Sequence, residues 1–360
     1  MEVLELTLPF KSPFPVLALG AEMKRGFSVL TGSRAYLRIG KGPLNDLEAL
    51  TLHKEEIDDF LEEKGITPKV IAVDAHPLYL NRKIAGDYGR KVTEVQHHRA
   101  HIASVMAENG ITDKVIGISL DGTGYGDDGA IWGGEFFVGD LSSMERMGHI
   151  DYFPLQGGDK AATETWRPAL GILNKKAPDL AEKIAERVGE KALLVLNAIR
   201  KDIGTVLTSS AGRLFDAAAF LILGISENTF EAEAPIKLEK AAEENIHYYK
   251  FSIIEKDGKF LLDPFPVFRE ILEDKRSPGE KSFSFHYGLA IGLVEVAEKM
   301  REATGIKKVA ISGGVFQNRL LTSILKDMLL NKNFEIIYHT KTPPHDGSLA
   351  LGQGVLALQR

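Results

Sequence analysis

Two histidines four residues apart, His97 and His101, are the side chains of this sequence best suited to chemistry. Residues at positions i and i+4 of a helix lie on one face, so their imidazole rings can bind the same metal ion. Asp121, directly after an apolar run, and Asp346, near the C-terminus, offer carboxylates to the same site. Imidazole and carboxylate donors favour a divalent cation with open positions, such as iron(II), manganese or zinc, over a closed structural site.

Each of these residues also has an ordinary structural interpretation. A histidine pair at this spacing is more often a surface or core feature than a ligand pair, and Asp121 can be a turn residue. Asp346 precedes a predicted helix, so one of its oxygens can cap that helix while the other meets the metal. A carboxylate beside bound phosphate would repel it unless a cation lay between them, which favours ligation by Asp121. His98 is expected to face away from the pair.

Glycine-rich segments follow several predicted strands. Residues 121–126 (Asp-Gly-Thr-Gly-Tyr-Gly) lie between predicted strands at 115–120 and 131–138, whereas a dinucleotide-binding fingerprint needs a helix after its glycines. A glycine hairpin is therefore expected, whose backbone N–H groups can cradle phosphate because no side chain intervenes. Adenosine is expected near the later glycine turns. The predicted nucleotide contacts are Gly122, Thr123, Gly124, Tyr125, Ser209, Gly212, Gly313, Gly314 and Asn318.

Length and composition limit the class of protein. A chain of 360 residues exceeds the usual size of one compact core, so two lobes are expected. The net charge of −6 gives no general attraction to nucleic acid or to anionic membranes. The sequence contains no cysteine, which excludes disulfides, cysteine–zinc modules and a thiol nucleophile on this chain. The N-terminal residues lack a signal-like pattern and no apolar stretch is long enough for a membrane span, so a cytoplasmic location is expected.

Strands and helices alternate along the chain, which indicates an α/β fold. Short strands are predicted at 16–19, 27–30 and 35–39, the last two separated by a turn at 31–33. Helices are predicted at 44–64, 97–108 and 347–358, among others. Two strand-rich beginnings, each followed by helices, predict a duplicated two-lobe architecture. We expect an N-terminal lobe at 1–112, completed by a helix at 345–360, and a nucleotide-binding lobe at 113–344.

Several longer motifs carry a resemblance to a known family. They look like the C-terminal carbamoyltransferase half of HypF, the hydrogenase maturation factor, and the resemblance extends over almost the whole chain. The motifs are residues 20–24 (Gly-Ala-Glu-Met-Lys), 74–79 (Asp-Ala-His-Pro-Leu-Tyr), 95–102 (Val-Gln-His-His-Arg-Ala-His-Ile), 121–135, 210–216 (Ser-Ala-Gly-Arg-Leu-Phe-Asp), 312–318 (Ser-Gly-Gly-Val-Phe-Gln-Asn) and 346–352 (Asp-Gly-Ser-Leu-Ala-Leu-Gly).

The resemblance implies a fold, a reaction and a ligand set. The fold is the two-lobe α/β fold of actin, sugar kinases and Hsp70, with a nucleotide and metal cleft between the lobes. His97, His101, Asp121 and Asp346 would hold a divalent metal, with ATP, AMP or carbamoyl-adenylate beside it and magnesium as a further option with the nucleotide. Lys24 and Arg167 are candidate catalytic contacts to phosphate or carbamoyl, as is Arg213, and each can equally be a salt bridge.

The implied reaction is carbamoyl transfer from carbamoyl-adenylate to the C-terminal cysteine of the partner HypE, for synthesis of the cyanide ligand of nickel–iron hydrogenases. Full-length members of the family carry, ahead of this half, an acylphosphatase domain, a cysteine-rich zinc module and a domain that forms carbamoyl-adenylate. This chain has none of them, so a separate domain or protein is expected to supply the adenylate.

Three other functions stay open at this point. A stand-alone O-carbamoyltransferase would act on a small hydroxylated molecule. A tRNA threonylcarbamoyltransferase would share the fold, but the net charge of −6 and the 121–126 motif disfavour it. A non-catalytic nucleotide-binding scaffold is the third, and the presence of all four candidate metal ligands disfavours it.

Overall fold

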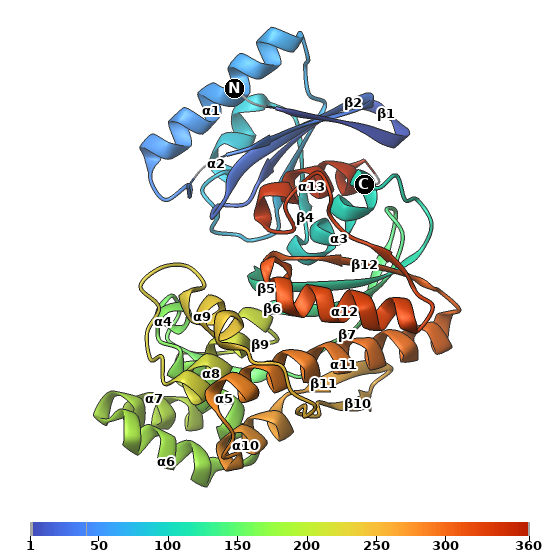
Figure 1. The fold of residues 1–360 in the computed structure, drawn as a ribbon. Coiled ribbons are helices and arrows are strands. Elements are labelled where there is room, and N and C mark those ends of the chain that lie inside the picture. Colours follow the sequence, from blue (N-terminus) through green and yellow to red (C-terminus); the bar gives the residue numbers. More distant parts are fainter. Residues whose placement is uncertain (1–2, 41, 359–360) are drawn as a thin grey trace.

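The computed structural model describes residues 3–40 and 42–358, which form two β-sheets, one above the other, with helices around and between them (Figure 1). The smaller sheet contains four strands in the order β2-β1-β3-β4. Its elements are β1 (Leu4–Gly20), β2 (Arg25–Ile39), α1 (Leu47–Lys64), β3 (Val70–Asp74), α2 (Arg82–Ala85), the 3₁₀ turn η1 (Gly86–Tyr88), β4 (Lys91–Val95) and α3 (His97–Glu108).

Strand β2 is longer than the sequence pattern predicts. The expected strands at 27–30 and 35–39 are parts of one strand, and the expected turn at 31–33 is wrong. Gly32 pairs with Ser12 of β1 at an irregularity in the register, so the pairing continues on both sides of this glycine. The glycine in the sequence suggested a turn. In the structure its positive φ of 55° accommodates a bulge in the strand.

The larger sheet begins with β5, and its strands and the helices around them contain most of the remaining chain. Its main path runs β10-β11-β7-β6-β5-β12-β13, and β8 and β9 pair beside β6. The strands are β5 (Val115–Tyr125), β6 (Ile131–Gly139), β7 (Met144–Ile150), β8 (Phe153–Gln156), β9 (Thr205–Thr208), β10 (Ser252–Lys256), β11 (Lys259–Asp263), β12 (Lys308–Ser312) and β13 (Glu335–Ile337). The helical segments are α4 (Lys160–Thr163), α5 (Trp166–Lys176), α6 (Pro178–Val188), α7 (Glu190–Arg200), α8 (Ala211–Leu223), α9 (Glu233–Ala241), α10 (Phe265–Glu273), α11 (Pro278–Thr304), η2 (Gly314–Gln317), α12 (Arg319–Asn331), η3 (Asp346–Ser348) and α13 (Leu349–Ala357).

The two sheets share one pattern of strand pairing. In the small sheet β1 pairs antiparallel with β2 and parallel with β3, which pairs parallel with β4. In the large sheet β5 pairs antiparallel with β6 and parallel with β12, which pairs parallel with β13. In each repeat the last strand leads to a helix, α3 after β4 and α13 after β13. The predicted duplication is therefore visible in the topology.

Helices α3 and α13 lie against each other between the two sheets (Figure 1). One apolar cluster joins them to the facing sides of both sheets and includes Leu37, Ile102, Ala310 and Val355. Helix α13 packs on β1, β2 and α3, while α3 contacts β1 as well as β5 and β12. Because α3 contacts both sheets, the lobe boundary at residue 112 stays a prediction. Residues 359 and 360 of the predicted C-terminal helix lie outside the described residues.

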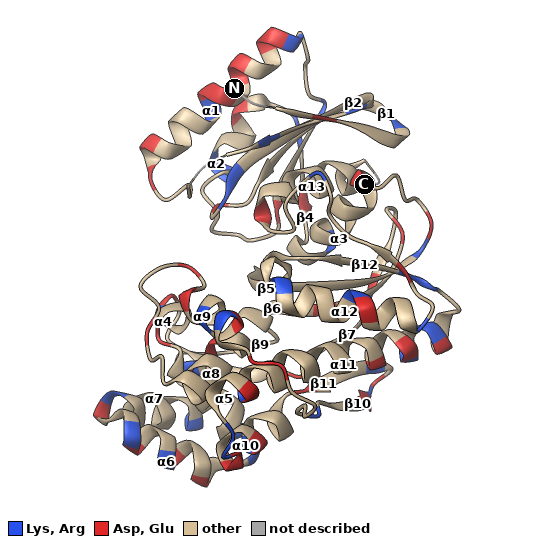
Figure 2. Cartoon of the chain, in the orientation of Figure 1, with Lys and Arg blue, Asp and Glu red and all other residues tan. Residues whose placement is uncertain are grey.

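Two further apolar clusters fill the outer faces of the sheets. Leu17, Phe27, Ile57 and Phe60 belong to the cluster that α1 forms with the small sheet. A larger cluster packs α5, α8, α11 and α12 around the large sheet. Both signs of charge are interspersed over the outer helices in Figure 2, with acidic residues numerous along α1. Among the described residues, no helix is both long and apolar enough to span a bilayer.

Candidate metal and nucleotide site

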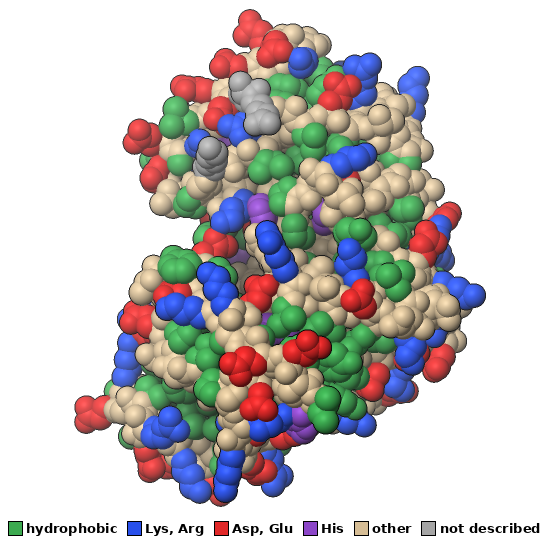
Figure 3. Space-filling model, viewed as in Figure 1, with side chains coloured by type: hydrophobic (Ala, Val, Ile, Leu, Met, Phe, Trp, Pro, Cys, Tyr) green, Lys and Arg blue, Asp and Glu red, His purple; other side chains and the backbone are tan. Residues whose placement is uncertain are grey.

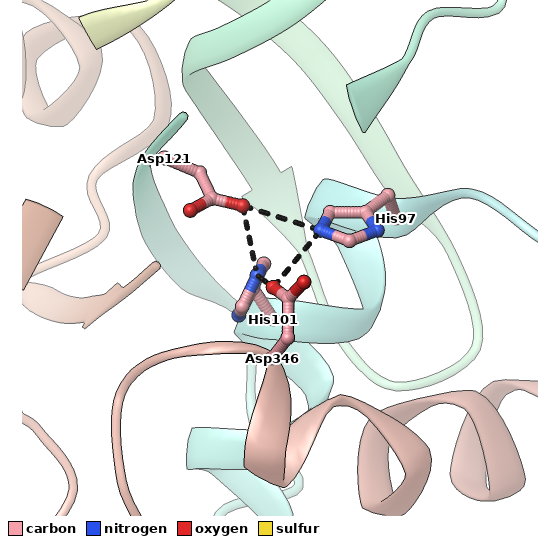
Figure 4. Close-up of side chains that lie close together, drawn as sticks. All are labelled: His97, His101, Asp121 and Asp346. Carbon is pink, nitrogen blue, oxygen red and sulfur yellow. Dashed lines mark hydrogen bonds and ion pairs between the residues drawn. The ribbon is translucent and has the colours of Figure 1, made fainter. Parts of the chain in front are cut away.

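The four predicted metal ligands come together in the structure. The donor atoms of His97, His101, Asp121 and Asp346 all lie within 4.8 Å of one another (Figure 4). The two imidazoles project from the first turns of α3, Asp121 comes from β5, and Asp346 is the first residue of η3. Residues from α3 and η3, which begin after the last strand of each repeat, thus meet at one point.

The distances between these donors fit a bound cation. His97 Nε2 lies 3.2 Å from Asp121 Oδ2 and 3.4 Å from Asp346 Oδ1, and His101 Nε2 lies 3.3 Å from each of the same oxygens. Charged N–H···O hydrogen bonds are usually about 2.7–2.9 Å long. Metal–ligand bonds of about 2.1 Å instead place neighbouring ligand atoms roughly 3.0–3.4 Å apart. The residues present therefore fit a divalent metal better than a set of hydrogen bonds.

Neighbouring groups leave the Nε2 atom of each imidazole directed at the shared space. His97 Nδ1 is 2.8 Å from Asp74 Oδ2, and His101 Nδ1 is 3.4 Å from Ser312 Oγ. Asp121 is oriented by the backbone N–H of Gly314, which donates to Oδ1 at 3.0 Å. Such outer contacts fix the tautomer and orientation of metal-ligating side chains. Asp74 and Ser312 lie in motifs that carry the resemblance, and Gly314 was predicted as a nucleotide contact, but the sequence did not reveal that these three residues position the ligands.

The electrostatics of the cluster follow from its burial and its charges. Burial opposes a charge on His97, but Asp346, Asp74 and Asp121 raise its pKa well above the ordinary value. Burial likewise opposes a charge on His101, and hydrogen bonds to Asp121 and Asp346 raise its pKa. The pKa of each of these two carboxyls is lowered by the two imidazoles, against the effect of burial. Without metal, protonated imidazoles therefore compensate the buried carboxylates.

The structure shows where the His98 side chain points and whether Asp346 caps a helix. His98 is buried beside Trp132, with 6.2 Å between ring centroids, and its Nδ1 lies 3.2 Å from the amide of Gln96. It faces away from the cluster, as expected. Asp346 does not cap the C-terminal helix, so that part of the prediction is wrong. The N-cap of α13 is Ser348, which makes no side-chain cap hydrogen bond. His345 caps the preceding η3 turn, because its Nδ1 accepts the N–H of Gly347 at 3.0 Å.

The glycine-rich segment is part of a strand, not of a hairpin turn. Strand β5 continues to Tyr125, with an irregularity between Leu120 and Gly124, and Gly124 pairs with Trp132 of β6. The turn lies further on, where Gly129 donates its N–H to the carbonyl of Gly126. The expectation that Asp121 follows the end of a strand is therefore wrong. It lies within a strand, at a bulge that redirects its side chain.

Among the predicted nucleotide contacts, Gly122 differs from the other glycines. A side chain built on Gly122 would meet nothing within 4 Å, whereas one on Gly124 would meet His98 and one on Gly212 would meet Gly122 itself. Gly314 would meet Asp121, and Gly313, with φ of 115°, would meet the carbonyl of Leu120. Close packing therefore explains why glycine is needed at the other four positions. Gly122 has no such neighbour and instead borders open space beside the cluster.

The remaining predicted nucleotide contacts divide into exposed and occupied side chains. Thr123 and Tyr125 are exposed, and the Tyr125 ring lies 5.7 Å from that of His76. The Ser209 hydroxyl donates to buried Glu135 at 2.5 Å. Asn318 caps α12 through the N–H of Leu321 at 2.9 Å, and its amide nitrogen lies 2.9 Å from His286 Nε2. The side chains of Ser209 and Asn318 therefore make hydrogen bonds within the fold, and their contact with nucleotide stays a prediction.

The three predicted cationic contacts lie in different settings. Lys24, in the turn between β1 and β2, pairs with Glu231 of the α8–α9 loop at 2.5 Å. Arg167 is buried and occupied by Glu164 at 2.8 Å and by the Gln156 side chain at 2.7 Å, so the structure does not bring it to the cluster. Arg213 pairs with Asp216 on the same helix at 2.6 Å.

Comparison with known proteins shows which family this chain is similar to. Residues 117–353 match the model described as the second subdomain of the carbamoyltransferase Kae1-like domain, and residues 11–108 match the HypF Kae1-like domain. The carbamoyltransferase HypF of Synechocystis is 32% identical over 376 residues, covering 98% of this chain and 48% of the relative. A HypF homolog of Cupriavidus necator is 32% identical over 374 residues, covering 98% of this chain and 94% of the relative.

Solved structures agree with the sequence matches. A full-length HypF in a phosphate- and nucleotide-bound form has a TM-score of 0.94 and 35% identity, covering 99% of this chain and 47% of that one. The HypF of T. kodakarensis has a TM-score of 0.89 and 34% identity, with 99% and 49% coverage. The fold and site thus define a Kae1-like carbamoyltransferase unit, and the predicted two-lobe α/β fold class is confirmed. The chain belongs to the HypF family, and it spans about half the length of the full-length relatives it matches.

We expect the His101→Ala variant to lose most of its bound metal, with an affinity at least about 100-fold lower, because one imidazole donor is removed from the set. The His98→Ala variant should keep its metal content, since His98 faces Trp132 and Gln96. Elemental analysis of folded, dialysed protein measures both. Equal occupancy in wild type and His101→Ala would remove His101 from the ligand set.

Metal affinity should rise with pH. Asp346, Asp74 and Asp121 raise the pKa of His97 well above its ordinary value, so His97 carries a proton in the metal-free protein near neutrality and metal binding must release it. Lowering the pH from about 8 to about 5 should weaken binding progressively. Without metal, the same pairs stabilise the fold between about pH 4 and 6.5, above the ordinary Asp and below the ordinary His pKa. Calorimetry in buffers of different ionisation enthalpy counts the protons, and no release at pH 7 contradicts the prediction.

Gly122→Val should weaken AMP or ATP binding at least about 10-fold while leaving thermal stability unchanged, because its side chain would enter open space that a ligand needs. Gly313→Ala is the contrasting variant. Its positive φ and its contact with Leu120 should lower the free energy of unfolding by more than about 1 kcal/mol. Calorimetry and thermal unfolding measure the two effects. Normal nucleotide affinity in Gly122→Val would show that this part of β5 does not line the nucleotide site.

Proposed function

We propose that this chain transfers the carbamoyl group of carbamoyl-adenylate to the C-terminal cysteine thiol of a HypE-like partner, a step in making the cyanide ligand of nickel–iron hydrogenases. The observation that carries the proposal is the convergence of two imidazoles and two carboxylates beside the open space at Gly122, in a chain of the HypF family. The nucleotide-bound form of a HypF relative supports a nucleotide at this site.

The chemistry needed at the site is modest. Carbamoyl-adenylate is a mixed anhydride with AMP as a good leaving group, so transfer requires orientation of the carbonyl and stabilisation of its developing negative charge. A divalent cation, when bound, supplies a Lewis acid for phosphate and carbonyl oxygens. His97, His101, Asp121 and Asp346 would hold that cation. The outer contacts from Asp74, Ser312 and Gly314 keep three of these side chains in place.

The phosphate of the adenylate would lie against the bulged part of β5. Main-chain N–H groups of residues 122–124 are close to the cluster, and Gly122 leaves room for a ligand beside them. Of the three predicted cationic contacts, Lys24 is the candidate for this role, because Arg167 and Arg213 are held in largely buried ion pairs. Its ion pair with Glu231 is partly exposed, so exchange of that carboxylate for a ligand phosphate costs little.

The acceptor must bring its own nucleophile because this sequence contains no cysteine. Figure 3 shows the surface hollowed between the upper and lower parts of the molecule, with histidine side chains inside the hollow and basic side chains near its rim. A flexible peptide tail can enter such a cleft, whereas a folded surface cannot. These features support a partner with a C-terminal thiol.

Two alternative acceptors can be weighed against this one. A small-molecule O-carbamoyltransferase is the second candidate, because the HypF homolog of C. necator shows that a relative of nearly this chain's length exists. A tRNA acceptor is disfavoured by the net charge of −6 and by the interspersed charges in Figure 2. In each case a separate adenylate-forming domain or protein would supply the activated substrate.

The test is a reconstitution with carbamoyl phosphate, ATP and a partner peptide that ends in cysteine. Without an added adenylate-forming domain little thiocarbamate should form, and with it the peptide should gain one carbamoyl group in the mass spectrum. Asp346→Ala should lower the reconstituted rate by more than about 100-fold, because it removes a metal donor. Adenylate synthesis by the added domain is the control and should not change.

Two results would contradict the proposal. If the chain alone forms thiocarbamate from carbamoyl phosphate and ATP, one cleft catalyses both steps. If a hydroxylated sugar or a tRNA gains the carbamoyl group while the peptide does not, the acceptor is wrong although transfer is right.

A further inference from the structure

A chain of buried hydrogen bonds continues outward from His101. Ser312 Oγ lies 3.4 Å from His101 Nδ1 and 2.9 Å from His339 Nε2, and His339 Nδ1 lies 2.8 Å from Glu108 Oε2. All four side chains are buried, although they come from separate places in the chain. His101 lies in the second turn of α3 and Glu108 at its end, Ser312 is the last residue of β12, and His339 follows β13. Three separate segments thus contribute to one line of polar groups.

The direction of every hydrogen bond in this line can be assigned. Burial opposes a charge on Glu108, but hydrogen bonds from His339, Thr342 and the backbone of residues 340 and 341 lower its pKa to about 2. An ionised carboxylate only accepts, so His339 donates from Nδ1 and keeps a lone pair on Nε2. Burial lowers the pKa of His339, which agrees with a neutral ring. Ser312 therefore donates to His339 Nε2 at 2.9 Å, which is closer than the Pro344 carbonyl at 3.4 Å, and its oxygen accepts from His101 Nδ1–H. With Nδ1–H held in this way, the proton that His101 gives up when a cation binds is the one on Nε2.

The arrangement of Ser312, His339 and Glu108 has the order of a nucleophile, base and carboxylate. Catalysis by the serine does not follow, because Ser312 is fully buried and its hydroxyl faces a metal-ligand candidate. Its second lone pair and its proton are engaged by the two histidines. The line therefore acts on His101 and not on a substrate.

We propose that Ser312, His339 and Glu108 are positioning residues that fix His101 with its Nε2 lone pair toward the cation and carry the influence of the Glu108 charge to that imidazole. The inference rests on the metal site of the proposed function. His97 has the direct counterpart in Asp74, at 2.8 Å, so each imidazole is backed by a carboxylate, one in contact and one through two intervening side chains.

Glu108 also links this line to the segment that delivers Asp346. Its Oε1 accepts the backbone N–H groups of Thr340 and Lys341, both at 2.6 Å, a few residues before that ligand. Gly313 donates to the carbonyl of Pro344 at 2.9 Å, which ties the segment to the turn after Ser312. The Glu108 carboxylate therefore acts on His101 through the hydrogen-bonded line and also fixes the backbone segment that leads to Asp346.

The test measures zinc affinity by competition with a chelator in three variants. Ser312→Ala interrupts the line and should weaken zinc binding about 10- to 100-fold. The matched control is Ser119→Ala on β5, because Ser119 pairs with Ser312 in register, is fully buried and has a hydroxyl without a hydrogen-bond partner in the described structure. It should leave the affinity within about 2-fold of wild type. His101→Ala provides the reference for a lost ligand.

The outcomes separate the two proposals. If His101→Ala binds zinc as wild type does, the metal site itself is wrong and this inference is wrong with it. If His101→Ala loses zinc while Ser312→Ala matches Ser119→Ala, only the positioning line is wrong. A second measurement needs no variant: in ¹⁵N-histidine-labelled wild type, His339 should be the neutral tautomer with its proton on Nδ1. A protonated ring, or a proton on Nε2, would overturn the assignment even if Ser312→Ala failed to fold.

Discussion

Two buried carboxylates that share one small space impose the main constraint on this molecule. Asp121 and Asp346 repel each other, and burial disfavours the charge on both, so positive charge must lie between or beside them. The protein meets this need with His97 and His101, and a cation would meet it more completely. This requirement constrains the positions of four elements, because their side chains or backbone groups must meet at one point. These elements are α3, the bulge in β5, the turn after β12 and the start of η3.

The repeated sheet pattern explains how such distant segments meet. Each repeat ends in a strand followed by a helical segment, and these two segments, α3 and η3–α13, are packed together between the sheets. Their starts therefore face a common point. The pairing of α3 with α13 by apolar side chains is thus what holds the polar cluster in place, and neither repeat contains the whole donor set.

Local pattern in the sequence predicted the features that depend on neighbouring residues, including the spacing of His97 and His101 on α3 and the alternation of strands and helices. It failed where a contact joins distant residues. Gly32 and Gly122 read as turns, but each lies at an irregularity inside a strand whose pairing continues on both sides. The sequence left open whether Arg167 forms a salt bridge, and in the structure Glu164 and Gln156 bind it. The contact of Asn318 with His286 joins residues too distant in the chain to be predicted. The hydrogen-bonded line from Glu108 to His101 joins residues far apart in the chain, so no sequence spacing could predict it.

The order of the four donors along the chain has a consequence for synthesis and folding. His97, His101 and Asp121 are made early, but Asp346 follows only after the whole large sheet, directly ahead of the helix that covers the inner face of the small one. A growing chain therefore holds an incomplete donor set until Asp346 and the helix after it have left the ribosome. A bound ion would meet all four donors only after the large sheet has been made, so it would stabilise the assembled fold and not its early steps.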